Sequence, residues 1–369
     1  MYNNQENSAL AIAEAEKYLQ KGQHEKSLKA CARALEADPS NYKAYELRWN
    51  ILCKIMSGEG ARKTMESEIE SILTKHPETP DMLNAVYSGY MYLPGRTQNV
   101  PESLFTKMLQ YPGTKAYLSA LVGLAERSQD ASEKLEYNRR IIDEFTISNA
   151  PMLSWYIMAY QELLRLAEQN RSLASDEDLD ELIERYLQDY LAYCRRNQWP
   201  FQLAYTQVAE WRIKLSVKLD KALEILEDAE RRLKEKEEQE WIEGYGLGVN
   251  IEFAQNEITR LQGQIFLKKE QWKEAYDAIK STAPPYLTSL GNRFKEDTIT
   301  HFFQLGMVAE GMGQLDIAIQ YYTNAHFAPK PHTKACAGLE RVYQTQHGSL
   351  EGVDAFLKEA EAFYRKREA

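Results

Sequence analysis

The stretch LGMVAEGMGQLDIAIQYYTNAHFAPK, residues 305–330, carries the pattern that decides the fold. Apolar residues recur in it at three- and four-residue spacing, which places them on one face of a helix. Gly313 interrupts this pattern near its middle, and Pro329 lies close to its end. Glycine permits the backbone of a tight turn, and proline cannot continue a helix. The stretch therefore predicts two antiparallel helices joined at Gly313.

The same arrangement of small residues occurs at two other places in the chain. A small residue is followed twelve positions later by a second one, with a turn expected seven positions after the first. Two helices of a hairpin approach closely only where the facing side chains are small, because larger ones would hold them apart. The pairs are Ala15 with Ser27, Gly263 with Ala275, and Gly306 with Ala318, and the turn positions are Gly22, Glu270 and Gly313. Because alternating β-branched stretches are almost absent elsewhere, the sequence predicts an all-α protein.

Residues 15–39, 263–276 and 305–330 resemble the tetratricopeptide repeat, a helical hairpin with a period of about 34 residues. The resemblance implies a superhelical array of antiparallel helix pairs, an α-solenoid, that is irregular in its middle. Gly263 and Gly306 lie further apart than one repeat allows, so we expect a longer loop around residues 283–292. The chain is accordingly divided into N-terminal hairpins over 1–110, a divergent region with longer helices over 111–245, and C-terminal repeats with capping helices over 246–369.

The end of the chain carries a second resemblance. The sequences AGLERVY (337–343), HGSLEG (347–352) and FYRK (363–366) look like the stretch that follows tetratricopeptide repeats in certain bacterial proteins with a thioredoxin-like (redoxin) domain. This resemblance implies an alternative function, that of a docking or regulatory repeat region of a redoxin protein. The four cysteines form no CxxC pair, so we do not expect the chain itself to be a thiol oxidoreductase.

Charge and composition narrow the choice of partner and compartment. The net charge is −10 and the isoelectric point about 5.4, whereas nucleic-acid binding needs a basic surface. No apolar run approaches the ~20 residues of a membrane-spanning helix. The N-terminus, MYNNQE, has neither the basic nor the apolar part of a signal peptide. We therefore expect no nucleic-acid binding, no membrane insertion and a cytoplasmic location, or a periplasmic or exported one if a signal was removed.

No group of residues in the sequence predicts catalysis, a cofactor or a metal. The acidic residues of 176–184 follow Ser175, a good N-cap, and indicate the start of a helix. His332 and Cys336 share a helical face, but with only His326 nearby they fall short of a closed zinc site. The glycines of 244–248 predict an interhelical loop, and the mixed charges of 230–238 predict a solvated helix face. We expect a protein that is not an enzyme.

The tetratricopeptide resemblance implies a protein-interaction scaffold, because stacked hairpins turn their first helices into a concave wall. A peptide or a helical segment of a partner protein would lie along this wall. The clamp that binds a C-terminal carboxylate in some family members is not expected at the N-terminal repeat, where Ile12 and Glu16 occupy the matching positions. Carried over by spacing, the partner-binding positions are Arg260, Gln264, Lys268, Phe303, Met307 and Glu310.

Overall fold

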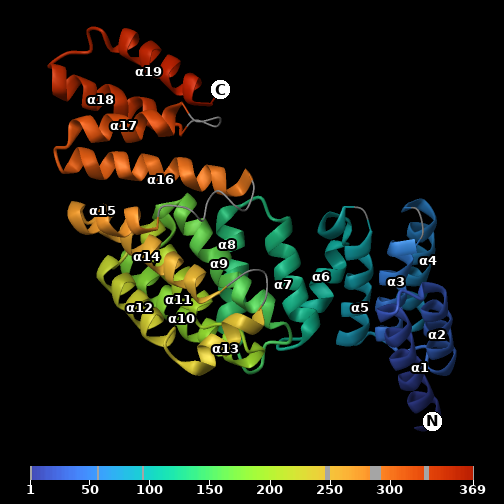
Figure 1. Cartoon of the computed structure of the whole chain (residues 1–369). Helices are drawn as coiled ribbons and strands as arrows, with labels where there is room; N and C mark the ends of the chain where they lie inside the picture. The colour runs from blue at the N-terminus through green and yellow to red at the C-terminus, as the bar shows by residue number, and fades with distance from the viewer. Residues whose placement is uncertain are drawn as a thin grey trace. The chain divides into compact units, whose positions relative to one another are not determined.

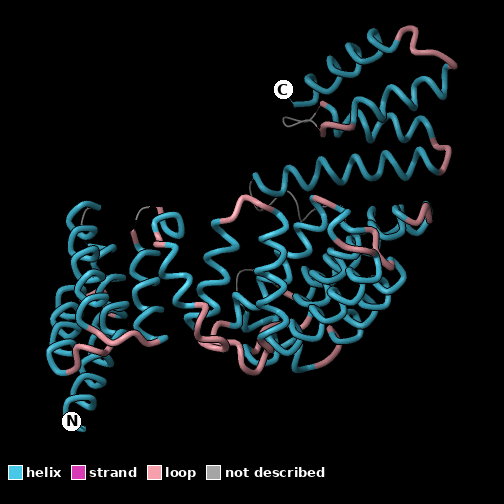
Figure 2. Tube along the Cα trace, turned by 180° about the vertical axis from the view of Figure 1, so that it is seen from behind, coloured by secondary structure: helices cyan, strands magenta, loops and turns pink. Residues whose placement is uncertain are grey.

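The computed structural model describes residues 2–55, 58–93, 95–245, 250–282, 292–327 and 332–368. Within these ranges it contains nineteen α-helices and two short 3-10 helices, joined by loops, and no strand (Figures 1 and 2). The prediction of an all-α protein is thereby confirmed. The chain divides into two compact units, Met1–Ala174 and Ser175–Ala369. The helices of the described ranges include no candidate for a membrane span.

The first unit is a series of helices in which each packs on the next along the chain. In addition, α1 contacts α3, α3 contacts α5, and α5 contacts α7, so the first members of successive pairs touch one another. The helices are α1 (Tyr2–Gln20), α2 (His24–Ala37), α3 (Tyr42–Ile55), α4 (Gly58–Lys75), α5 (Pro80–Tyr92), η1 (Arg96–Asn99), α6 (Glu102–Met108), α7 (Lys115–Arg127), α8 (Ala131–Glu144), α9 (Leu153–Gln169) and η2 (Arg171–Leu173).

The second unit continues with antiparallel pairs, and α16, α17 and α18 lie side by side in it (Figure 1). Here α11 contacts α14, and α16 contacts α18. The helices are α10 (Asp176–Asn197), α11 (Gln202–Leu215), α12 (Leu219–Arg232), α13 (Lys236–Tyr245), α14 (Ile251–Lys268), α15 (Trp272–Ser281), α16 (Asn292–Gly311), α17 (Leu315–His326), α18 (Ala335–His347) and α19 (Val353–Glu368).

The three turns predicted from the small-residue spacing all adopt the left-handed backbone conformation. Gly22 has a φ of 68° and Gly313 a φ of 71°, and Glu270, which occupies the same position in the middle hairpin, has a φ of 57°. A non-glycine residue in this region is uncommon, because its Cβ crowds the backbone. The turn geometry therefore follows from the hairpin template even where glycine is missing.

The small residues also lie where the spacing predicts a close approach of two helices. Ala15 and Ser27 are fully buried, and the Ser27 hydroxyl donates to the Ala15 carbonyl at 2.7 Å. A Cβ added to Gly263 would stand 2.8 Å from a side-chain carbon of Ile279 on α15, closer than real contacts allow. These two hairpins are held at distances that larger side chains would not permit.

Tyr322 of α17 is buried between two glycines on the neighbouring helices. A Cβ added to Gly306 of α16 would stand 2.6 Å from the tyrosine ring, and one added to Gly338 of α18 would stand 2.8 Å from it. The Tyr322 hydroxyl donates to Glu310 at 2.7 Å. The ring is thus enclosed on both sides by backbone and held at its tip by a hydrogen bond.

Three sequence-based expectations for residues 201–248 differ from the structure. Residues 201–241, in the region for which longer helices are expected, are divided among three helices, because α11 ends at Leu215 and α12 at Arg232. The charged run 230–238 crosses the boundary between α12 and α13, and Glu238 within it is buried rather than solvated. Gly244 and Tyr245 belong to α13 and not to the expected loop, while 246–248 lie outside the described residues. Residues 283–291 of the loop predicted around 283–292 also lie outside them, and Asn292 begins α16.

Ser175 begins α10 as the acidic cluster predicts. Its hydroxyl accepts the backbone N–H of Asp178, and the Asp178 carboxylate accepts the backbone N–H of Ser175 in return, which is a capping box. Two other acids of the cluster, Asp180 and Glu184, bind the buried guanidinium of Arg212 on α11 at 2.7 and 2.5 Å. The cluster is thus a helix start and an anchor for the next helix.

Candidate functional site

The three partner-binding positions predicted on α14 lie along one stripe of that helix, at its surface. Arg260 is half-buried and pairs with Glu257, one turn earlier, at 2.6 Å. Gln264 is also half-buried. Lys268 is exposed and donates to the hydroxyl of Ser216, the C-cap residue that follows α11, at 2.7 Å. Partial burial lowers the pKa of Lys268.

The three positions predicted on α16 are largely engaged within the second unit. The ring of Phe303 stacks on that of His332, with centroids 3.9 Å apart, and Met307 packs on the cluster around Tyr322. Glu310 accepts two hydrogen bonds from the Arg341 guanidinium, at 2.5 and 2.7 Å, besides that from Tyr322. Burial opposes ionisation of Glu310, but these bonds outweigh it and hold its pKa below the usual value.

The structure therefore brings Phe303, Met307 and Glu310 together, but as parts of the packing between α16, α17 and α18. The α14 positions and the α16 positions are separated by α15, which packs against both helices. Glu310 in particular binds the Arg341 guanidinium and the Tyr322 hydroxyl. The contacts therefore give no evidence that these six residues share one surface.

A polar cluster that the sequence did not predict joins three successive first helices of the first unit. It consists of Glu46 on α3, Asn84 and Ser88 on α5, and Lys115 and Ser119 on α7; we call it the Glu46 cluster. Glu46 accepts hydrogen bonds from Ser88 at 2.9 Å and from the Asn84 amide at 3.3 Å. Ser119 donates to the amide oxygen of Asn84 at 2.9 Å. The Lys115 ammonium lies 4.0 Å from the Glu46 carboxylate.

Local sequence explains how these side chains reach one another. Asn84 and Ser88 are four residues apart on α5, as are Lys115 and Ser119 on α7, so each pair projects from one face of its helix. Thr79 and Thr114 accept the backbone N–H of the third residue of α5 and α7 respectively and so set where each helix begins. Because the two helices begin at these positions, both polar pairs lie on the faces where α5 and α7 meet.

The residues of the Glu46 cluster differ in burial, so that some are inner residues and others are outer residues. Asn84 and Ser119 are 6% and 1% exposed, whereas the side chains of Glu46 and Lys115 are 28% and 44% exposed. Buried polar groups persist only when they are hydrogen-bonded, and both inner residues are. One turn beyond Glu46, the Asn50 amide donates to the hydroxyl of the exposed Tyr92 at 3.5 Å. The half-exposed residues thus form a continuous polar strip across α3 and α5.

The polar strip combines several kinds of hydrogen-bonding group. Carboxylate, amide, hydroxyl and ammonium groups together donate and accept hydrogen bonds, which suits the backbone and side chains of an extended peptide. The serines contact a carboxylate and an amide, with no histidine in the Glu46 cluster to act as a base. Among the residues that the structure describes, no group of three His, Cys, Asp or Glu side chains is placed to hold a metal ion.

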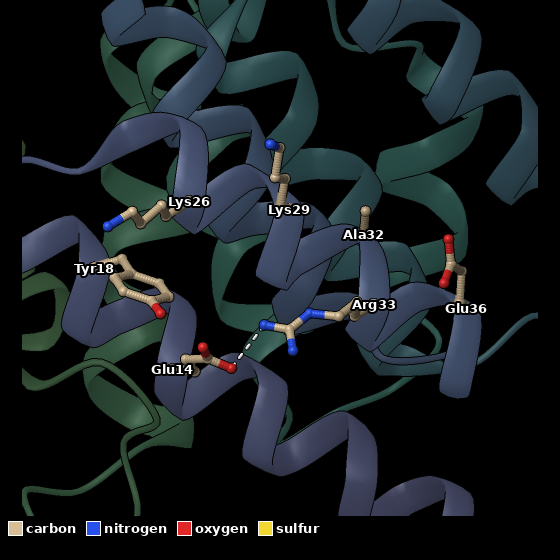
Figure 3. Close-up of a pocket in the computed structure, with 7 residues that line it drawn as sticks. All are labelled: Glu14, Tyr18, Lys26, Lys29, Ala32, Arg33 and Glu36. Atoms are coloured by element: carbon tan, nitrogen blue, oxygen red, sulfur yellow. Dashed lines mark hydrogen bonds and ion pairs between the residues drawn. The ribbon is translucent and has the colours of Figure 1, made fainter.

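A second surface feature is an open hollow of about 480 Å³ on the first hairpin. Figure 3 shows its residues, with Glu14 and Tyr18 on α1 opposite Lys26, Lys29 and Arg33 on α2. Arg33 donates to Glu14 at 2.7 Å, and the Lys26 ammonium lies 5.7 Å from the Tyr18 ring centroid. Hydrogen bonds from Tyr18 and Arg33 lower the pKa of Glu14. The charge of Glu14 is therefore already compensated by Arg33 across the hairpin.

Ile12 and Glu16, at which no carboxylate clamp is expected, both have partners within the first unit. Ile12 is buried in the core between α1, α2 and α3, and Glu16 pairs with Lys43 at 2.7 Å. His332 and Cys336, weighed above as metal ligands, have other partners, since His332 stacks on Phe303 and the Cys336 thiol contacts Glu340 at 3.6 Å.

Comparison with known proteins found no relative of the chain. No protein-family model matches the chain, and no curated protein matches it in sequence.

Proposed function

We propose that the chain is a non-catalytic scaffold that binds an extended segment of a partner protein on the first helices of a tetratricopeptide-type solenoid. The Glu46 cluster carries this proposal, because it connects three successive first helices through hydrogen-bonded polar groups, some buried and some half-exposed. Successive first helices in contact, α1 to α3 to α5 to α7, are the arrangement from which such a wall is built.

The polar strip supplies what recognition of an extended peptide requires. Its inner residues are hydrogen-bonded to one another and therefore hold the outer ones in fixed positions, which lowers the entropy lost on binding. Glu46, Asn50 and Tyr92 then present an acceptor, an amide and an aromatic ring within two helical turns. Tyrosine contributes contact area at a small rotamer cost.

Site-specific photocrosslinking tests the proposal. A photoreactive phenylalanine analogue is placed at Tyr92, and in a matched control at Leu73, an exposed residue on α4 in the same unit. We expect a defined protein to be linked from Tyr92 and not from Leu73, and the link to be lost in Glu46→Arg when circular dichroism shows that the variant is folded. Equal crosslinking from both positions, or a yield that Glu46→Arg leaves unchanged, would contradict the proposal.

A further inference from the structure

A hollow of about 550 Å³ lies where the end of α10 meets α13 in the second unit. Trp199 lines it from the segment between α10 and α11, and Trp241 and Tyr245 line it from α13. Asn197 and Gln198 contribute amides, and Glu240 contributes a carboxylate. A Cβ added to Gly244, which also lines the hollow, would meet nothing within 4 Å, so the space beside this helix is open.

The aromatic rings meet at nearly right angles and so form the corner of a box. Trp199 and Tyr245 have ring centroids 5.5 Å apart and an interplanar angle of 78°. Tyr193 packs behind Trp199 at 5.2 Å and 86°. Perpendicular rings present a face and an edge to the same space, and the face of an aromatic ring is negative.

The two walls of the hollow are tied together by a buried carboxylate. Glu238 of α13 is 1% exposed and accepts the backbone N–H of Phe201 at 3.0 Å and of Gln202 at 2.8 Å, where α11 begins. Phe201 in turn packs on Trp241, with centroids 5.0 Å apart. The walls are therefore set before any ligand arrives, as in most small-molecule sites.

Charge selects the kind of ligand. Glu240 is the single charged residue among the described residues that line the hollow. Its pairing with Lys236, at 3.3 Å, involves side chains that are 62% and 89% exposed, so an incoming cation can replace the lysine at little cost. Phe201, which packs on Trp241, already has two cations near its ring, because the guanidiniums of Arg195 and Arg232 lie 5.7 and 4.9 Å from its centroid.

We propose that this hollow binds an organic cation, a guanidinium or a methylated ammonium, between Trp199, Trp241 and Tyr245 with Glu240 as the opposing charge. Such groups combine a diffuse positive charge with apolar surface, which is the chemistry that aromatic boxes recognise. Asn197 and Gln198 at the rim add hydrogen-bonding groups for the rest of the ligand. The site shares no residue with the Glu46 cluster, so it stands or falls independently of the scaffold function.

Calorimetric titration of the whole chain distinguishes charge from shape. The probes are choline, its neutral isostere 3,3-dimethylbutanol, and the peptide-like amides N-acetylarginine amide and N-acetyl-trimethyllysine amide. We expect choline to bind at least tenfold more tightly than the neutral isostere, and its binding to weaken as salt is raised. A response to choline alone assigns the site to a free ammonium compound, and a tighter response to the amides assigns it to a side chain of a partner protein.

Variants of residues that line the hollow locate the binding, each with a control outside it. Glu240→Gln should weaken choline binding several-fold, whereas the matched control Glu243→Gln, an exposed acid of the same helix outside the hollow, should not. Trp199→Leu should abolish binding, and Trp155→Phe in the first unit should leave it unchanged. Equal binding of choline and its isostere, equal effects of the two glutamine variants, or no binding of any cation would overturn the proposal. Because Glu240→Gln changes only a surface charge, it tests the site even if Trp199→Leu does not fold.

Discussion

Replacing Gly306 with alanine tests the enclosure of Tyr322 directly. The added methyl group would stand 2.6, 2.7 and 3.0 Å from three ring carbons of Tyr322. The ring cannot move away, because the backbone at Gly338 lies against its other side and its hydroxyl is bonded to Glu310. The methyl group must therefore be accommodated by separation of α16 from α17.

Two opposing effects set the change in the free energy of unfolding that Gly306→Ala causes. Overpacking a close-packed site costs about 1–3 kcal/mol, and an enclosed ring places this case near 3. Alanine in place of glycine inside a helix stabilises the helix by about 1 kcal/mol, because alanine has the higher helix propensity. We expect Gly306→Ala to lower the free energy of unfolding by about 2 kcal/mol. In a Tyr322→Ala background the ring is gone, so the same substitution should raise it by about 1 kcal/mol, a coupling of about 3 kcal/mol.

Hydrogen exchange of the α16–α18 amides, read by mass spectrometry, measures these changes where they occur. A local measurement is preferable because a chain of two units need not unfold in one step. Gly244→Ala serves as the control, since its added methyl group meets nothing within 4 Å and should not destabilise α13. A Gly306→Ala variant that protects α16–α18 in both backgrounds would refute the enclosure of the ring.

Glu238→Ala should lower the free energy of unfolding by about 1–3 kcal/mol, because two buried N–H groups at the start of α11 lose their acceptor; a urea midpoint equal to that of the wild type would show that the cap is dispensable. Burial opposes ionisation of Asp180, yet hydrogen bonds from Lys221 and from the buried arginine of α11 hold its pKa below the ordinary value. Its contribution to stability is therefore complete above about pH 4 and lost as the pH falls through the lowered pKa, so the melting temperature of Asp180→Asn should depend less on pH in this acid range than that of the wild type; parallel curves would contradict this. Burial raises the pKa of Cys31 to about 11 and that of Cys194 to about 12, so at about pH 8 both should resist alkylation until the chain unfolds, as mass spectrometry of the labelled peptides would report. Labelling of either buried thiol as fast as the exposed one of α3 would disprove their protection.

The hairpins were predictable because their signals are local. Gly22 and Gly313 mark their turns by residue type, and spacing alone predicted a turn at Glu270, which the structure shows in the same left-handed conformation. Ala15 and Ser27 likewise report a helix crossing within one hairpin, confirmed by the hydrogen bond between them. These positions follow from period and residue size, both of which a single sequence displays.

The sites were less predictable because they depend on residues far apart in the chain. The bond between Ser119 and Asn84 spans 35 positions, and the only sign of either residue in the sequence is that it interrupts an apolar helix. Spacing named Glu310 as a partner-binding position but could not show its bond to Arg341, which lies 31 residues later. Glu238 sits in a run of alternating charges that resembles a solvated helix, and its burial arises from the start of α11.

The order in which the helices touch has a consequence for how the chain reaches its native state. Wherever helices pack extensively in the described ranges, they are neighbours in chain order or are separated by one or two others. Contacts between residues close in sequence close short loops, and proteins rich in them fold fast. We expect refolding to start at several hairpins at once and to spread outward from each. A mutation that destabilises one hairpin should therefore slow the folding of the neighbouring hairpins but not that of distant ones.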